Sequence, residues 1–192
     1  MRSSSRNSGT PFRALTAAAV SLLLGSVTQA ADQPQKFVFT AFSNGRGGQA
    51  LVSGHFEEAA AELRRAPLSA LALQRGMASN NRCIALSMTR QWDLAHAACD
   101  AAVRDAQLEH TELSPYNIYG RNLEDEYVAL ALANRAVLHW ISSESAAAES
   151  DLRKAQHLAP KSAFVTRNLT ALHAPHPAVA QVTVASQATG KN

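Results

Sequence analysis

Three stretches of the sequence carry the same spacing of small and apolar residues, and this repeat constrains the fold more than any other feature. Each stretch centres on an alanine, at Ala59, Ala95 and Ala148. Small residues recur twelve positions before and seven positions after these alanines, at Gly47, Cys83 and Ala136 and at Ala66, Ala102 and Ala155. Small residues let two helix backbones approach closely, while larger apolar residues fill the space beside them. The spacing therefore predicts pairs of helices joined by short turns.

The repeat resembles that of the tetratricopeptide repeat family, whose unit is a helix-turn-helix of 34 residues. The third stretch is similar to it through Asn134-Arg135-Ala136 and Pro160, and the second through Asn81-Arg82-Cys83. The resemblance implies an all-α fold: a short solenoid of three helical hairpins followed by a capping helix, at about residues 40–73, 76–109, 123–160 and 162–173. A cap is expected because the last hairpin of a stack otherwise exposes an apolar face.

Two features depart from the family pattern. The first helix of the first hairpin would contain Gly45, Gly47 and Gly48, and a glycine inside a helix costs about 1 kcal/mol relative to alanine. About nineteen additional residues separate the second and third hairpins, and residues 111–121 among them predict an irregular loop because they contain proline and glycine. A long loop of this kind is either functional or a neutral surface insertion.

The two ends of the chain differ from the repeat region. Three arginines and no acidic residue precede an apolar run at residues 14–24, and small residues follow as far as Ala30. These are the parts of a secretory signal peptide. We therefore expect cleavage of residues 1–30, a periplasmic or secreted protein, and an N-terminal extension at residues 31–39. Residues 174–192 contain prolines and many small residues and are predicted to form a disordered tail.

Length and charge exclude several classes of partner. The apolar run has eleven residues, whereas a bilayer-spanning helix takes roughly 20, so no stable membrane span is expected. Without the first thirty residues, the 18 basic residues fall to 15 and equal the 15 acidic ones. A neutral chain gives no reason to expect a nucleic acid as partner.

No catalytic or metal-binding motif is recognisable by spacing. The seven histidines are scattered, and none stands in an HExxH arrangement. The glycine-rich residues 45–48 lack the Lys-Ser/Thr pair of a phosphate-binding loop. We therefore expect no metal, no cofactor and no enzymatic activity. An enzyme would need a pocket in the insertion, where Tyr116, Tyr119 and Arg121 are the unassigned polar candidates.

One arginine recurs in each hairpin, at Arg46, Arg82 and Arg135. Glu62 and Asp151 stand sixteen residues after the first and third of them. This spacing predicts ion pairs that join the two helices of a hairpin. Ala98 occupies the matching position of the second hairpin, so Arg82 either finds another acceptor, such as Asp100, or binds an anion.

The two cysteines, Cys83 and Cys99, fall on the two helices of the second hairpin. Export favours a disulfide. Addition of the helix rise to the backbone separation gives a Cα distance of about 8 Å, beyond the reach of about 7 Å that a disulfide allows. A disulfide and two small core thiols therefore both remain open.

An apolar stripe is the strongest indication of function. The resemblance implies that the first helix of each hairpin lines a concave surface, which is usually polar in the family. Here the lining is apolar: Leu51, Val52, Ile84, Met88, Val137, Trp140 and Ile141. An exposed apolar surface of this kind requires a cover.

The cover has three candidates. A segment of a partner protein or peptide is one, because extended and helical segments bind apolar grooves through their own apolar side chains. The chain's own residues 37–42 or 179–184 are another, and a second copy of the chain in a homo-oligomer is the third. The subclass of the family that grips C-terminal carboxylates is not expected, because Asn80 and Ala133 stand where its basic residues would be. We therefore expect a non-enzymatic binding or assembly module of the bacterial cell envelope, with a self-associating subunit as the alternative.

Overall fold

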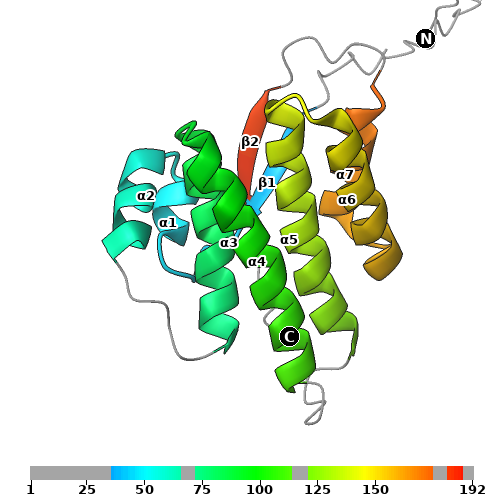
Figure 1. Cartoon of the computed structure of the whole chain (residues 1–192), viewed down its shortest axis with the longest axis horizontal. Helices are drawn as coiled ribbons and strands as arrows, with labels where there is room; N and C mark the ends of the chain where they lie inside the picture. Colours follow the sequence, from blue (N-terminus) through cyan, green and yellow to red (C-terminus); the bar gives the residue numbers. More distant parts are fainter. Residues whose placement is uncertain (1–35, 66–71, 114–120, 175–180, 188–192) are drawn as a thin grey trace, which may run out of the picture. The chain divides into compact units, whose positions relative to one another are not determined.

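The computed structural model describes residues 36–65, 72–113, 121–174 and 181–187, which all belong to one compact unit of the chain. Most of these residues are helical (Figure 1). The helices and strands follow one another as β1 (Phe37–Ala41), α1 (Gly48–Val52), α2 (Phe56–Arg65), α3 (Ala72–Met88), α4 (Trp92–Leu113), α5 (Arg121–Ile141), α6 (Ser145–Leu158), α7 (Ala163–Leu172) and β2 (Val182–Ser186).

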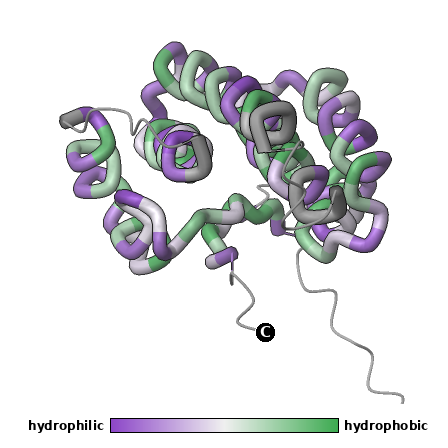
Figure 2. The backbone as a smooth tube through the Cα atoms, turned by 90° about the horizontal axis from the view of Figure 1, so that it is seen from below, coloured by the Kyte–Doolittle hydropathy of each residue, from purple (hydrophilic) through white to green (hydrophobic). Residues whose placement is uncertain are grey.

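Consecutive helices pack against one another in pairs. The helix α3 packs along α4, α5 packs along α6, and α4 joins the two pairs by packing on α5. Bands of hydrophobic and hydrophilic residues alternate along the helices (Figure 2), as expected for helices with one buried face. The anchor alanines Ala59, Ala95 and Ala148 are fully buried, which explains their recurrence in the sequence.

The first hairpin is the least regular because Gly45 and Gly47 precede its first helix and lie in a turn. Gly47 has a positive φ of 69°, and α1 begins only at Gly48. A Cβ atom on Gly48 would lie 2.0 Å from the carbonyl oxygen of Phe42. The glycine-rich segment is therefore the tight turn that leads β1 into α1, and the helix that follows is only five residues long.

The insertion between the second and third hairpins is taken up partly by longer helices. The helix α4 continues to Leu113 and α5 begins at Arg121, so both enter the segment predicted as a loop, residues 111–121. Residues 114–120, which include Tyr116 and Tyr119, lie outside the described residues, as does the predicted signal peptide. No helix within the described ranges combines the length and the hydropathy that crossing a membrane requires.

The two strands form a parallel pair that sequence analysis did not predict. Phe37 is in register with Val182, and Ala41 with Ser186. Residues 182–186 are thus a strand rather than part of a disordered tail, because they pair with a segment far away in the sequence. The strand β1 also crosses the boundary predicted at residue 39 between the extension and the helical domain.

A disulfide joins Cys83 to Cys99 within the core between α3 and α4. Their Cα atoms are 4.5 Å apart. The expected separation of about 8 Å was wrong because it added a full helical turn between the two residues. The actual packing of α3 on α4 brings the two positions to the same level.

Candidate functional site: a strand-binding groove

The seven residues of the apolar stripe lie together around β1. Leu51, Ile84 and Val137 are fully buried in one cluster with Phe37 and Phe39. The remaining stripe residues are partly buried against the same cluster: Val52, Met88, Trp140 and Ile141. The chain's own β1 and β2 therefore cover the stripe, and each overlaps one of the two segments considered as internal covers, residues 37–42 and 179–184.

Three asparagines hold the backbone of β1, one from each of the helices α3, α5 and α7. Asn81 Oδ1 accepts from Phe42 N at 2.9 Å, and Asn81 Nδ2 donates to Phe42 O at 2.9 Å. Asn134 makes the same two bonds with Thr40, at 2.8 and 2.9 Å. Asn168 makes them with Val38, at 2.8 and 3.0 Å. These three residues form an asparagine ladder that grips every second peptide unit.

Asn80 extends this network between the helices. Its Nδ2 donates to Thr40 O at 3.1 Å, and its Oδ1 accepts from Asn134 Nδ2 at 2.8 Å. All four asparagine side chains are buried. Since a buried amide without partners is unfavourable, the groove requires an extended backbone along this line.

The side chains of β1 are buried on both faces of the strand. Phe37 stacks on Trp140 with ring centroids 4.3 Å apart, and Phe42 stacks on Tyr127 at 5.3 Å. One edge of β1 faces the asparagine ladder, and its other edge pairs with β2, where Ala41 O accepts from Gln187 N at 2.7 Å. The strand β1 is thus fixed on all sides.

The strand β2 is held less firmly. Val182 and Val184 pack against the cluster around β1 but are only partly buried, and Thr183 and Ser186 are exposed. Apart from β1, the packing partner of β2 is the short helix α1. The groove therefore contains one firmly held strand and one peripheral strand.

The recurrent arginines differ in their hydrogen-bond partners from one hairpin to the next. Arg135 forms the predicted pair with Asp151 and also bonds to Asp100 at 2.9 Å. Hydrogen bonding to Asp151 raises the pKa of Arg135 above its ordinary value. Asp100 makes no ion pair with Arg82 within the described residues, and the buried Nε of Arg82 has no hydrogen-bond partner there.

The ion pair expected between Arg46 and Glu62 does not form. Both residues are exposed, and within the described part of the chain they make no salt bridge with each other. Arg46 precedes α1 in the turn, where its carbonyl oxygen accepts from Asn81 Nδ2 at 3.0 Å. The turn geometry places Arg46 outside the helix that the ion pair would have required.

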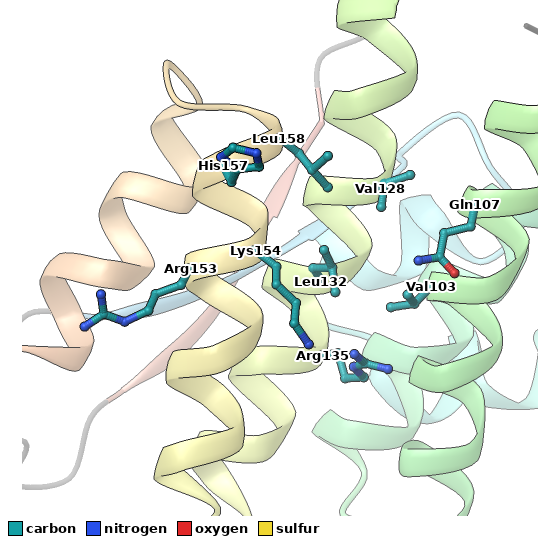
Figure 3. A pocket seen from close by; sticks show the side chains of 9 residues that line it. All are labelled: Val103, Gln107, Val128, Leu132, Arg135, Arg153, Lys154, His157 and Leu158. Atoms are coloured by element: carbon teal, nitrogen blue, oxygen red, sulfur yellow. The ribbon is translucent and has the colours of Figure 1, made fainter.

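A second depression lies between α4, α5 and α6, with a volume of about 550 Å³. Its floor is aliphatic and its rim is basic (Figure 3): Val103, Gln107, Val128, Leu132, Arg135, Arg153, Lys154, His157 and Leu158. Arg153 points away from the other side chains in this view, and it bonds to Glu149. The lining offers no carboxylate, hydroxyl or thiol group, and its titratable side chains are those of Arg135, Arg153, Lys154 and His157.

Comparisons with protein families, curated proteins and solved structures yield no match to this chain. The likeness to the tetratricopeptide repeat family accordingly rests on the spacing of residues. Sequence analysis singled out Asn81 and Asn134 but missed Asn80 and Asn168 as parts of the groove. A signal for Asn168 existed, because it follows Asn134 by 34 residues, the length of one repeat.

Proposed function

We propose that this protein is a non-enzymatic, tetratricopeptide-type binding module that takes up an extended segment of a partner protein as a strand beside β1. The asparagine ladder is the observation that carries this proposal. By fixing β1 through its backbone, the ladder turns the opposite edge of β1 into a rigid template for strand addition. Strand addition of this kind gains affinity from main-chain hydrogen bonds and specificity from alternate side chains.

The position of β2 is the one that a partner would occupy. This strand follows six residues outside the described ranges and is the less buried of the two. The energy needed to release β2 is therefore smaller than that needed to release β1 and Phe42, which would break seven asparagine hydrogen bonds.

The groove defines the chemistry of the partner segment. Val182 and Val184 face the apolar cluster, while Thr183 faces away from it. A fitting segment is extended, runs parallel to β1, and carries aliphatic side chains at two alternate positions. Charged side chains at those positions would be partly buried against the apolar cluster without a partner and are disfavoured.

A second candidate function is self-association. The β2 sequence of one copy already fits beside β1, so a neighbouring copy could supply it by strand exchange. Light scattering distinguishes the two functions, because strand exchange yields a dimer and binding of a foreign segment does not.

A peptide competition experiment tests the proposal. A fluorescent peptide with the sequence of residues 181–187 is titrated against the full chain and against its Val184→Asp variant. The tethered strand competes at an effective concentration on the order of millimolar. We expect the variant, with its own strand weakened, to bind the peptide at least about tenfold more tightly than the unsubstituted chain.

Thr183→Asp is the matched control, because its side chain is exposed on the opposite face of the same strand. This variant is expected to behave like the unsubstituted chain. A folded Val184→Asp variant that fails to bind the peptide would contradict the proposal and would leave β2 a purely structural strand.

We also infer that the protein works outside the cytoplasm, from the signal-peptide pattern of residues 1–30. Mass spectrometry of the protein recovered from the producing cells tests this inference. A mature chain that begins at Ala31 is expected, and an uncleaved chain in the cytoplasmic fraction would contradict it.

A further inference from the structure

Three potential metal ligands from three different helical segments meet at one end of the bundle. His96 lies near the start of α4, His139 in the last turn of α5, and Glu144 immediately before α6. One ligand atom from each lies within 4.8 Å of the other two. His139 Nδ1 bonds to Glu144, and His96 Nε2 is 3.8 Å from Glu144 Oε1. We call these three residues the His-His-Glu triad.

The backbone holds two members of the triad in place. Glu144 N donates to His139 O at 2.7 Å and closes the turn between α5 and α6, in which Ser143 has a positive φ of 69°. Glu144 O then accepts from Ala148 N in the first turn of α6. The packing of α4 on α5 brings His96 opposite this turn, with the two imidazole centroids 5.6 Å apart.

We infer that the His-His-Glu triad binds a divalent transition metal ion of the zinc type. Two imidazoles and one carboxylate are a ligand set that Zn²⁺ accepts, with a fourth position left for water or an external ligand. Zinc bonds of about 2.0–2.1 Å keep tetrahedral ligand atoms about 3.3 Å apart, so His96 must move toward the other two ligands while His139 Nδ1 and Glu144, which bond directly here, must separate. His96 and Glu144 are partly exposed, so both are free to make this adjustment by rotation about side-chain bonds.

A carboxylate behind the triad supports this assignment independently. Asp151 Oδ2 lies 3.7 Å from His139 Nε2, on the side of the ring opposite Glu144, and its side chain is only 5% exposed. Arg135 fixes this carboxylate through two hydrogen bonds. Metal-bound histidines commonly donate their second ring N–H to a carboxylate, which orients the ring and leaves the other nitrogen free for the metal. At 3.7 Å the carboxylate of Asp151 is just beyond hydrogen-bond distance, so a small rotation of the His139 ring makes Asp151 a positioning residue for His139.

Other histidine and glutamate pairs in the described residues lack these features. His55 and Glu58 approach to 3.6 Å on α2, but both are strongly exposed, and no third ligand is grouped with them. His55 is therefore a matched control: it has the same ligand chemistry without the third ligand or the buried carboxylate.

Zinc titration of the metal-stripped full chain, carrying a tag without histidine, tests the inference. Calorimetry under non-reducing conditions is expected to show one zinc ion per chain. His96→Gln is expected to weaken binding at least about tenfold. His55→Gln is expected to leave the affinity unchanged.

Cobalt provides a second readout that does not depend on heats of binding. Co²⁺ in the site is expected to show visible absorption of a low-coordinate complex, which His96→Gln removes and excess Zn²⁺ displaces. Absence of stoichiometric binding, or equal affinities for the His96→Gln variant and the unsubstituted chain, would overturn the inference. The outcome is independent of the proposed strand-binding function, which is measured with a peptide.

Discussion

Arg135 holds Asp151 through two parallel hydrogen bonds, from Nε at 2.7 Å and from Nη2 at 2.9 Å. The pair joins α5 to α6, and the carboxylate of Asp151 is almost completely buried. The same guanidinium reaches Asp100 on α4. One side chain thus links three helices of the bundle through charge-assisted hydrogen bonds.

Loss of this link should destabilise the fold. Arg135→Ala leaves Asp151 buried without its main partner, so we expect the free energy of unfolding to fall by about 2 kcal/mol. Arg153→Ala is the control, because its ion pair with Glu149 is exposed and should contribute little to stability. Urea unfolding measures both. Equal losses would contradict the structural role of the buried pair.

The asparagine ladder should govern the protection of β1. Asn134→Ala removes both hydrogen bonds to Thr40 and one to Asn80, so we expect a loss of about 3 kcal/mol and faster hydrogen exchange at the Thr40 amide. The exposed Asn44→Ala should change stability by less than about 0.5 kcal/mol. Unchanged exchange at Thr40 would show that the ladder does not hold the strand.

The turn after β1 should tolerate no side chain at Gly48. A Cβ atom there would overlap the Phe42 carbonyl oxygen, and we expect Gly48→Ala to cost about 3 kcal/mol. At Gly54 a Cβ atom would meet nothing within 4 Å, but φ is positive at 80°, so Gly54→Ala should cost only about 1 kcal/mol. Thermal unfolding compares the two variants, and a smaller loss at Gly48 would argue against the tight turn.

The disulfide should contribute measurably to stability. It closes a loop with a sequence separation of 16, for which chain entropy predicts about 3 kcal/mol. Urea unfolding of a Cys83→Ala, Cys99→Ala double variant should show this loss. Alkylation under denaturing, non-reducing conditions should leave both cysteines unmodified, and two alkylated cysteines would disprove the bond.

An exposed ion pair should be visible in the titration of Glu149. Hydrogen bonding from Arg153 lowers the pKa of Glu149 below its ordinary value. The pair therefore stabilises the fold while the carboxylate is ionised, and this contribution is lost as the pH falls through the lowered pKa. Carbon-13 NMR should show the midpoint rise in Arg153→Ala. High salt should reduce the shift, and a midpoint unchanged by the substitution would disprove the assignment.

Local periodicity and small offsets made the helical hairpins and the link from Arg135 to Asp151 predictable, because both depend on neighbouring helices with a fixed geometry. The apolar stripe was also predictable, but the identity of its cover stayed open because β1 and β2 pair across most of the length of the chain, from Phe37 to Val182. The His-His-Glu triad escaped for the same reason: His96 and His139 lie on different hairpins, and no sequence spacing relates them. Contacts between residues of different hairpins cannot be predicted from the spacing of those residues in the sequence.

The asparagines stand along the chain in the reverse of their order along β1. Asn81 binds Phe42, Asn134 binds Thr40 and Asn168 binds Val38, so successive helices hold the strand from its C-terminal end to its N-terminal end. The strand β2, last in the sequence, covers the remaining edge. A hydrophobic strand with two open edges would be a template for pairing with other chains, and here both edges are occupied from within the same chain.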